Sequence, residues 1–462
     1  MQRTRRYVSS QGMKPHALLI NPWIYDFSAY NLWYRPLGLL YIASLLRING
    51  VDVSLIDCLE EEPGAIYKEN LIPGKMKPAG DGTYLRERIE KPPPLRMIPR
   101  NYHRFGLPPV RVREKLGSLA RPDVILITTM LTYWYPGLFE MIALVREIFP
   151  GAPVVIGGNY VSLCPDHAKQ SGADVILPGE AERTLPGLLK ELLKIDMQNL
   201  PDPDNLDSYP YPAFDLLEKP ASLPVMTSRG CSFRCSYCAS HLLFPTFRRR
   251  DPILVADEIA FWHRRFGTKN FSFYDDALLV DSRNMAIPLL EEIIRKELPL
   301  QFHCPNGLHL REATPEISRL MKKAGFKTLR FGFETSDLLR QKETGGKVNN
   351  AQLAEAVKNM KEAGYLPGDM GIYILCGLPG QTEEEVAESI RYVQSLGARP
   401  VLAEYSPIPG TGLWHDAAAA SPYPIAEEPL FHNNTLLPCR NASLTIASYQ
   451  RLKLLSRQRK EA

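Results

Sequence analysis

The stretch "SRGCSFRCSYCAS" (228–240) places Cys231, Cys235 and Cys238 close together, whereas the other cysteines of the chain are scattered. Thiolate sulfur is a soft ligand that suits iron–sulfur clusters and zinc. A four-iron cluster has four corners, so three cysteines would leave one iron open to a small molecule. A structural zinc usually takes four protein ligands, and His241 would have to complete such a set. The spacing predicts a metal centre and favours a cluster over zinc.

The cysteine stretch follows the first strand of a long series in which strands and helices alternate. The candidate strands of this series are 223–228, 270–275, 300–304, 328–334, 371–377 and 400–406. The helical patterns between them are 252–265, 284–297, 314–324, 350–364 and 382–396. Repeated strand–helix units of this kind predict an open parallel barrel whose chemistry lies at the carboxyl ends of the strands.

An earlier alternating series occupies the first part of the chain. Its β-rich runs are 16–22, 51–57, 123–129, 153–158 and 174–179, and its helical patterns are 36–50, 136–149 and 182–194. This order predicts a mostly parallel sheet with helices on both faces, which binds ligands at the carboxyl ends of its strands. The fold class expected is therefore α/β: an N-terminal Rossmann-like doubly wound parallel sheet followed by a partial (β/α)6 barrel.

Three segments fall outside the two series. Residues 60–121 are rich in proline and basic residues, which predicts an insertion with little regular structure. Residues 195–222 are rich in proline and aspartate and are interpreted as a linker. The expected domains are thus 1–194 with its insertion, the barrel at 223–410, and a C-terminal extension at 411–462 that ends in a basic helix near 442–460.

The overall composition is that of an ordinary globular protein. Hydrophobic residues make up 45%, charged residues 23%, and the net charge is +4, a balance that argues against a dedicated nucleic-acid binder. No apolar run reaches the roughly 18 residues of a membrane span, and the basic N-terminus lacks a signal-peptide pattern. We expect a cytoplasmic protein, in which clustered cysteines act as metal ligands before disulfides.

The C-x3-C-x2-C spacing, with Tyr237 just before the third cysteine, resembles the signature of the radical S-adenosylmethionine (SAM) enzymes. The resemblance implies that Cys231, Cys235 and Cys238 hold a 4Fe–4S cluster whose open iron is chelated by the amino and carboxylate groups of SAM. An electron from the cluster then cleaves SAM, and a 5′-deoxyadenosyl radical abstracts hydrogen from the substrate. The same resemblance implies an external electron donor such as flavodoxin or ferredoxin.

Other stretches of the barrel series resemble parts of the same family that lie near SAM. They are "FYDDALLV" (273–280), "RFGFETSD" (330–337) and "CGLPGQTEEE" (376–385), while "YSPIPGTGLW" (405–414) resembles the segment that closes the barrel. The residues to which the resemblance gives SAM-binding roles are Tyr237, Asp276, Glu334, Ser336, Gly377 and Gly380. Each stretch also has a structural alternative, such as a helix cap at Asp276 or Thr382 and a surface position for Glu334.

The first series resembles the cobalamin-binding domain that precedes many radical SAM barrels. The matching stretches are 35–57, 128–137, 154–162 and 174–182. The resemblance assigns the nucleotide tail of cobalamin to Thr128, Thr129, Gly157 and Gly158. The chain departs from the cobalt-binding D-x-H-x-x-G pattern, because no histidine lies between His16 and His103. The alternative is a degenerate domain that only shapes the substrate channel.

Several further residues have two interpretations. Trp23, Trp33 and Trp134 fall on predicted strand-end loops, where they would pack on a flat macrocycle or between domains. Cys304 and Cys376 end barrel strands and are expected to be buried small apolar residues, with hydrogen-atom donation to a product radical as the alternative.

The expected function is a radical SAM reaction on a small molecule or a peptide, and methyl transfer to an unactivated carbon if cobalamin binds. Without cobalamin, the alternatives are radical cyclisation, rearrangement or oxidation, with the first domain as a scaffold. A cluster protein that only carries electrons is disfavoured, because an electron carrier needs no barrel. The sequence identifies neither the substrate nor a catalytic residue.

Overall fold

The strands of the first sheet are continuous apolar runs, as expected for strands covered on both faces. In the computed structural model, which describes residues 14–60, 71–218 and 220–458, these strands are all parallel and lie in the order β11-β10-β9-β1-β3. Their bounds are β1 (His16–Asn21), β3 (Asp52–Asp57), β9 (Val124–Thr129), β10 (Val154–Gly158) and β11 (Val175–Leu177).

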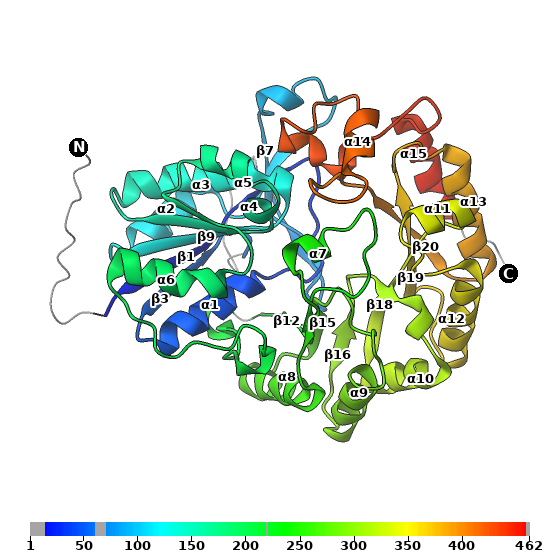
Figure 1. Cartoon of the computed structure of the whole chain (residues 1–462), viewed down its shortest axis with the longest axis horizontal. Coiled ribbons are helices and arrows are strands. Elements are labelled where there is room, and N and C mark those ends of the chain that lie inside the picture. The colour runs from blue at the N-terminus through cyan, green and yellow to red at the C-terminus, as the bar shows by residue number, and fades with distance from the viewer. Residues whose placement is uncertain (1–13, 61–70, 219, 459–462) are drawn as a thin grey trace.

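Helices cover both faces of this sheet (Figure 1). They include α1 (Leu37–Ile48), α3 (Tyr135–Ile148), α4 (Asn159–Leu163) and α6 (Ala181–Leu193). Successive residues of β1 enter different cores: Leu18 and Ile20 pack on one side of the sheet, Ala17 and Leu19 on the other. The predicted Rossmann-like doubly wound sheet is confirmed.

The second series forms a parallel sheet in the order β12-β15-β16-β18-β19-β20. The strands are β12 (Ser222–Val225), β15 (Asn270–Phe273), β16 (Gln301–His303), β18 (Phe326–Glu334), β19 (Met370–Cys376) and β20 (Arg399–Glu404). A short strand, β17 (Leu308–His309), pairs with β18 off this path. Because β12 and β20 do not pair with each other, the predicted partial (β/α)6 barrel is confirmed.

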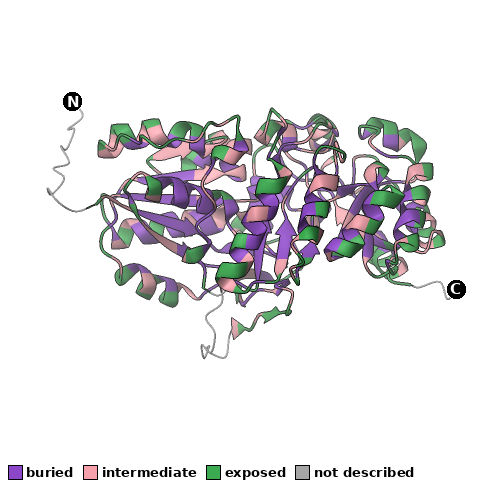
Figure 2. Cartoon of the chain, turned by 90° about the horizontal axis from the view of Figure 1, so that it is seen from below, coloured by how far each residue is buried: buried purple, intermediate pink, exposed green. Residues whose placement is uncertain are grey.

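In the described part of the chain, six helices of this series cover the barrel strands, and two of them have clear capping residues at both ends. The six are α8 (Pro252–Phe266), α9 (Ala286–Arg295), α10 (Pro315–Ala324), α11 (Leu338–Glu343), α12 (Asn350–Glu362) and α13 (Glu383–Ser395). The side chains of Asp251 and Thr314 accept hydrogen bonds from the first turns of α8 and α10, and each of these helices ends at a left-handed glycine, Gly267 or Gly325. Figure 2 shows their exposed residues turned outward and the buried strands inside.

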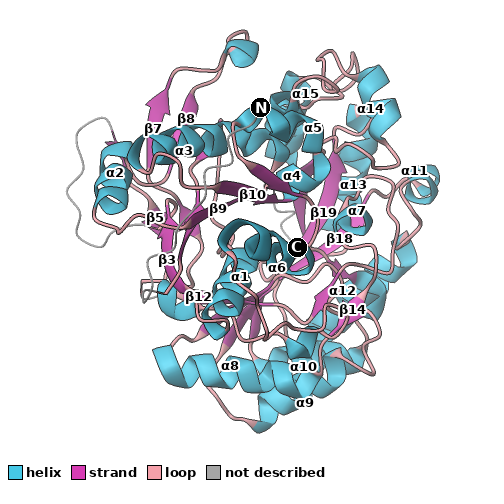
Figure 3. Cartoon of the chain, turned by 60° about the vertical axis from the view of Figure 1, so that its left-hand side comes forward, coloured by secondary structure: helices cyan, strands magenta, loops and turns pink. Residues whose placement is uncertain are grey.

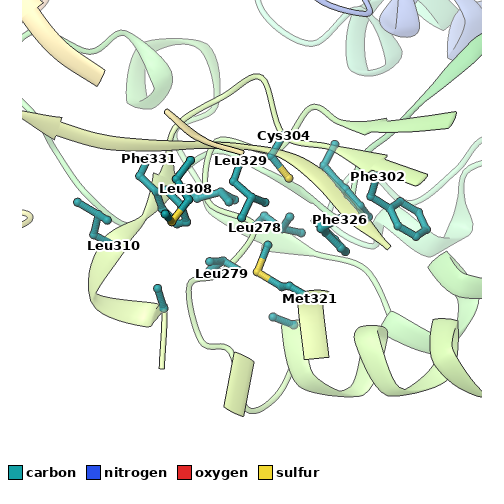
Figure 4. Close-up of a cluster of buried hydrophobic side chains, with 14 of the residues drawn as sticks. Leu278, Leu279, Phe302, Cys304, Leu308, Leu310, Met321, Phe326, Leu329 and Phe331 are labelled. Atoms are coloured by element: carbon teal, nitrogen blue, oxygen red, sulfur yellow. The ribbon is translucent and has the colours of Figure 1, made fainter. Parts of the chain in front are cut away.

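Aromatic side chains fill the space between the barrel strands and the helices that cover them. Phe302 on β16 and Phe326 on β18 have ring centroids 5.0 Å apart, and Phe273 on β15 stacks on Phe326 at 5.5 Å. Figure 4 shows this core, with Met321 of α10 and Leu329 of β18 in the same cluster. The carboxyl ends of the strands are the expected place for a site in such a barrel.

The prediction that residues 60–121 have little regular structure is wrong for the part that the structure describes, 60 and 71–121. An antiparallel sheet in the order β2-β8-β7-β4 consists of β2 (Ile24–Asp26), β4 (Leu71–Ile72), β7 (Arg86–Ile89) and β8 (Tyr102–Phe105), and α2 (Pro109–Gly117) follows it. These strands have two to four residues, too short for a period-2 pattern to emerge among the prolines. Val112 and Leu116 of α2 pack into the core beneath α3.

Buried ion pairs join the two parallel sheets. Arg229 on β13 (Ser228–Arg229) of the barrel side places Nη1 2.9 Å from Glu180 and Nη2 2.6 Å from Glu182 of the first series. Arg248 on β14 (Arg248–Arg249) lies 2.5 Å from the same oxygen of Glu180. We call these four side chains the interdomain ion-pair cluster. All are 6–8% exposed, so removing one would leave charges buried without a partner.

The C-terminal segment, residues 421–441, packs against both halves of the molecule (Figure 1). Asn433 donates to Asp26 of β2 at 2.8 Å, and Ser406, just after β20, donates to the carbonyl of His432 at 2.6 Å. The segment lies between α14 (Trp414–Ala420) and α15 (Ile446–Leu455), and α15 is the predicted basic helix. The predicted domain limits at 194, 222 and 410 stay predictions.

Candidate cofactor site

The three clustered cysteines lie on a loop that follows β13 and is held from both sides. Cys231 Sγ accepts a hydrogen bond from the backbone of Phe233, and Cys238 Sγ accepts one from the backbone of Ser240, each at 3.4 Å. The Ser236 hydroxyl donates to the carbonyl of Glu343 at 2.9 Å. Hydrogen bonds within the loop and to the end of α11 therefore define its shape.

The thiols suit a metal cluster chemically. Burial raises the pKa of the Cys231 thiol and raises that of Cys238 to about 11, and the neighbouring cysteines add to the effect. Binding of iron to the cysteine sulfur would stabilise the thiolate, which is the form that burial disfavours. In the described ranges, no three His, Cys, Asp or Glu side chains are close enough to hold a single metal ion. A four-iron cluster makes no such demand, since each of its cysteines binds a different iron.

A buried imidazole lies beside the first cysteine. His309 on β17 places Nε2 3.8 Å from Cys231 Sγ, and its ring stacks on Phe233 with centroids 4.6 Å apart. Burial, with Lys347 and Arg311 nearby, lowers the pKa of His309 to about 4. Sequence reasoning missed His309, because β17 is a two-residue strand outside the regular alternation.

Glu334, predicted to bind SAM, ends β18 in a left-handed conformation with φ of 74°. Its carboxylate is paired with Lys347, whose ammonium group donates to the hydroxyl of Tyr237 at 2.9 Å. Burial alone would lower the pKa of Lys347, but Glu334 and the cluster cysteines raise it. The structure thus brings Tyr237 and Glu334 together around Lys347. Sequence reasoning missed this lysine, although it follows a glycine pair in the segment after β18.

The two aspartates after β15 have different roles. Asp275 accepts hydrogen bonds from Thr227 and Ser228, and burial raises its pKa to about 6, which indicates a structural role. Asp276 accepts from Ser240 at 2.6 Å and lines the cavity described below. The site role expected for Asp276 therefore has a suitable position.

Ser336, Gly377 and Gly380 lie beyond the ends of β18 and β19 but do not line that cavity. The backbone of Ser336 donates to the Ser389 hydroxyl at 2.9 Å. Gly377 has φ of 95°, and its N–H donates to the side chain of Gln381 at 2.8 Å. Their predicted roles at SAM stay predictions, supported by their place at the carboxyl ends of the strands.

A cavity of about 700 Å³ lies between the two parallel sheets. The four residues predicted to bind cobalamin, Thr128, Thr129, Gly157 and Gly158, line it from the ends of β9 and β10. Cys238 and Asp276 line it from the barrel. Neither series alone forms this cavity, because residues of both halves line it. Figure 3 shows the first sheet, with β9 and β10, above β12 and the barrel helices α8, α9 and α10.

Of the glycine pair at the end of β10, Gly158 is required by its surroundings, whereas Gly157 has room for a Cβ. Gly158 has φ of 97°, and an added Cβ would lie 2.4 Å from the carbonyl oxygen of Thr129. An added Cβ on Gly157 would lie 3.5 Å from Leu177. Backbone and hydroxyl groups are therefore the surface that β9 and β10 offer to a bulky ligand.

The rest of the cavity wall is largely apolar, with several aromatic side chains, and it carries two arginines, Arg35 and the ion-paired Arg229. Arg35 lines the cavity, and its Nε is buried without a hydrogen-bond partner among the described residues. Its backbone N–H donates to the hydroxyl of Tyr274 at 2.7 Å, which ties the first domain to the barrel. A guanidinium in this position suits an anionic group of a cofactor or substrate.

The three tryptophans of the predicted loops do not share one position. Trp134 lines the cavity and donates to Asp26 at 2.8 Å. Trp23 instead donates to the carbonyl of Leu107 at 2.6 Å, and Trp33 stacks on His303 of the barrel at 4.4 Å. Trp33 thus packs between the domains, and only Trp134 is placed to touch a ligand in the cavity.

The cysteines outside the loop are buried or half-buried away from the cavity. Cys304 and Cys376 are buried and lie in the hydrophobic core of the barrel, as expected for small apolar residues. All cysteines of the chain are free thiols.

Models of two protein families match the chain over the regions just described. The radical SAM superfamily model matches residues 225–393, and the B12-binding domain model matches residues 108–189. The chain therefore belongs to the radical SAM superfamily. More particularly, it is a radical SAM enzyme with a B12-binding domain N-terminal to the radical SAM domain, and its cofactors are a 4Fe–4S cluster, SAM and cobalamin.

Curated relatives extend the match beyond the two models. An uncharacterized methyltransferase of Pyrococcus horikoshii is 28% identical over 64% of this chain and 70% of its own length. A cytidylyl-2-hydroxyethylphosphonate methyltransferase of Streptomyces wedmorensis is 24% identical over 85% of this chain and 78% of its own. An anaerobic magnesium-protoporphyrin IX monomethyl ester cyclase of Cereibacter sphaeroides is 26% identical over 66% and 55%.

A solved structure shares the whole arrangement. The radical SAM methyltransferase TsrM from Kitasatospora setae, solved with cobalamin and a 4Fe–4S cluster bound, superposes with a TM-score of 0.64. The match covers 96% of this chain and 89% of that one at 15% sequence identity. This likeness shows a common fold. No helix in the described part of the chain is long and apolar enough to cross a membrane.

Proposed function

We propose that this chain is a cobalamin-dependent radical SAM methyltransferase that methylates an unactivated carbon of a small molecule or a peptide. The observation that carries the proposal is the shared cavity: Thr128, Thr129, Gly157 and Gly158 line it from one sheet, and Cys238 and Asp276 from the other. A methyl carrier and a radical-generating centre must both reach the same substrate atom. The cavity supplies one volume that is open to both.

The residues of the chain have distinct tasks in this proposal. Cys231, Cys235 and Cys238 would hold the cluster, and the groups at the ends of β9 and β10 would hold cobalamin. When bound, the cluster supplies the electron that cleaves SAM, and cobalamin supplies the methyl group. Lys347 and Glu334 form an ion pair beside the cysteine loop, and this pair would orient the charged groups of a ligand bound there. The aromatic wall of the cavity excludes water from the reacting carbon.

The test is anaerobic reconstitution with iron, sulfide and hydroxocobalamin, followed by addition of SAM and titanium(III) citrate. We expect about one corrinoid per chain, release of 5′-deoxyadenosine, and formation of S-adenosylhomocysteine together with methylcobalamin. Methylcobalamin formation requires no knowledge of the substrate. A protein that releases 5′-deoxyadenosine but retains no corrinoid and forms no S-adenosylhomocysteine would contradict methyl transfer.

That contrary result would favour the second candidate, a radical cyclisation, rearrangement or oxidation with the first domain as scaffold. The similarity to the ester cyclase of Cereibacter sphaeroides supports this candidate. Either reaction needs an external one-electron donor such as flavodoxin or ferredoxin. We also propose that the enzyme works in the cytoplasm, where its thiols stay reduced.

A further inference from the structure

The cysteine loop has an inner and an outer face. Cys238, Ala239 and Ser240, followed by Leu243 and Phe244, line the cavity between the sheets. Arg234 is exposed and does not line that cavity. The two faces therefore meet different surroundings: the inner face meets cofactor and substrate, and the outer face meets solvent.

The cover over Cys235 on the outer face is a glycine. Gly345 is exposed with φ of 116°, and an added Cβ would lie 3.0 Å from the Cα of Cys235. The next residue, Gly346, is also exposed and has open space at its Cβ position. Since neither residue has a side chain, a protein that touches this turn comes close to the cluster ligand. Short separation between redox centres is what electron transfer between proteins requires.

Positive charge surrounds this turn. Arg234, Arg311 and Lys342 are exposed, and none forms an ion pair with any residue in 14–60, 71–218 or 220–458. The guanidinium of Arg311 lies over the ring of Phe233 at 4.7 Å, which fixes it beside the loop. Two carboxylates lie nearby: Glu343 is paired with Arg340, and Asp337 caps α11 by accepting from the backbone of Arg340, so neither forms an ion pair with the three cations.

Two leucines complete the outer face. Leu338 and Leu339 on α11 are 61% and 67% exposed. They precede Lys342 by four and three residues, which places them on the same side of the helix. Apolar side chains next to unpaired charges are typical of protein interfaces, which combine an apolar centre with a polar rim.

We propose that Leu338, Leu339, Arg234, Arg311 and Lys342 form the docking surface for an acidic one-electron carrier protein. The inference rests on the proposed function, because a cluster that cleaves SAM must be reduced for each cleavage. In the docked complex the reduced carrier loses one electron and the cluster gains it, without any bond formed or broken in this chain. The cations select an acidic partner and steer its approach, and transient redox complexes need only a small interface.

The experiment compares two reductants in the reconstituted holoenzyme. The double variant Arg234→Glu/Lys342→Glu reverses charge on the docking surface, and the matched control Lys323→Glu/Lys327→Glu reverses two exposed cations at the amino-terminal end of β18. The rate of 5′-deoxyadenosine release is measured against the concentration of reduced flavodoxin, and separately with titanium(III) citrate, at low and high salt.

We expect the docking variant to need at least about tenfold more flavodoxin for half-maximal rate at low salt, and to match the wild type with titanium(III) citrate. The control should behave as the wild type with both reductants. A second variant, Leu338→Ser/Leu339→Ser, should raise the flavodoxin requirement without changing the salt dependence.

Two results would overturn the inference. One is an unchanged flavodoxin requirement in both docking variants, and the other is an equal loss of rate with flavodoxin and titanium(III) citrate. If the wild type itself releases no 5′-deoxyadenosine with titanium(III) citrate, the proposed function fails, and the docking inference falls with it.

Discussion

Glu334 is the residue whose backbone most clearly departs from ordinary geometry within the site. Its φ of 74° is a conformation that L-residues other than glycine rarely adopt and that costs about 1–3 kcal/mol. The carboxylate is nevertheless buried and paired with Lys347. Strain of this kind persists where the surroundings hold it, and here those surroundings are the cysteine loop and Tyr237.

Replacing Lys347 with methionine should destabilise the protein, because the Glu334 carboxylate would be left buried without its partner. We expect a loss of about 3 kcal/mol in the free energy of unfolding. The matched change Arg451→Met removes an exposed ion pair with Glu383 and should cost much less stability, because solvent screens that pair. Urea unfolding of the two variants measures the loss in the free energy of unfolding. Equal losses would show that the buried ion pair contributes no more to stability than the exposed one.

The cysteine assignment predicts a sharp contrast between two substitutions. Cys235→Ala should lower the iron content and abolish 5′-deoxyadenosine release, because the cluster would lose one of its three ligands. Cys304→Ala removes a buried thiol from the barrel core and should leave both quantities near the wild-type values. Iron analysis and product assays under anaerobic conditions measure them. Undiminished release in the Cys235 variant would refute the cluster.

The corrinoid site can be tested through the glycine pair of β10. Gly158→Ala would force a Cβ to within 2.4 Å of the Thr129 carbonyl, so we expect the corrinoid retained after gel filtration to fall by at least about tenfold. Gly172→Ala is the control, since Gly172 has a similarly positive φ of 79° but open space around its Cβ position. Equal retention by both variants would place cobalamin elsewhere.

At the scale of single residues, the sequence was informative where spacing along the chain sets the chemistry. Cys231, Cys235 and Cys238 belong to one loop, so their proximity follows from the chain itself. Lys347 and His309 reach the same loop from other elements, and nothing in a single sequence shows that they meet it. The SAM-binding assignments stay predictions for the same reason.

Among the elements, the C-terminal segment depends on a buried histidine. His432 Nε2 donates to the carbonyl of Ile425 at 2.8 Å, and Nδ1 accepts from the Thr132 hydroxyl at 2.9 Å, so the ring is held neutral. Burial lowers the pKa of His432 to about 4. In the unfolded chain the His432 imidazole takes up a proton below a pH of about 6.5, whereas in the folded chain it does so only near pH 4.

The contribution of His432 to stability is therefore complete above about pH 6.5 and is lost as the pH falls toward 4. Between pH 7 and 5 the wild type should lose about 2 kcal/mol more stability than His432→Gln. Urea unfolding midpoints at the two pH values measure this difference. Parallel losses in both proteins would show that other groups, such as His303, dominate the acid response.

A regular element could be predicted where its own residues contained a helix cap or a clear hydrophobic pattern. Thr382, named as a possible helix cap, accepts a hydrogen bond from the backbone of Glu385 at the start of α13, and continuous apolar runs marked the buried strands. The sheet of β2, β8, β7 and β4 was missed, because strands of two to four residues are stabilised by pairing with distant strands rather than by their own pattern.

For the molecule as a whole, the interdomain ion-pair cluster couples the two sheets. Burial alone would raise the pKa of the Glu180 carboxyl, but Arg248 and Arg229 hold it below its usual value. The cluster fixes the two walls of the cavity relative to each other, because its ion pairs join the two halves of the molecule that line the cavity. The cavity itself could not be predicted from the sequence, since it depends on how two separately predicted units pack.

Arg229→Met should therefore uncouple the halves. We expect about 3–5 kcal/mol of destabilisation and an earlier, separate unfolding step of one half, because Glu180 and Glu182 would lose a buried partner. Differential scanning calorimetry resolves the steps, and Arg113→Met, which breaks an exposed pair with Glu147, is the control. A single cooperative transition at the wild-type temperature would show that the ion pairs do not couple the halves.

The hydrogen bond between Asp26 and Asn433 spans 407 residues of sequence. A ribosome adding about 5–20 residues per second would release Asn433 roughly 20–80 s after Asp26. Throughout that interval the nascent first sheet has to keep a carboxylate hydrated that the finished protein buries. Nascent chains arrested near residue 400 should thus react with water-soluble carboxyl-modifying reagents at Asp26, from which completed chains are shielded.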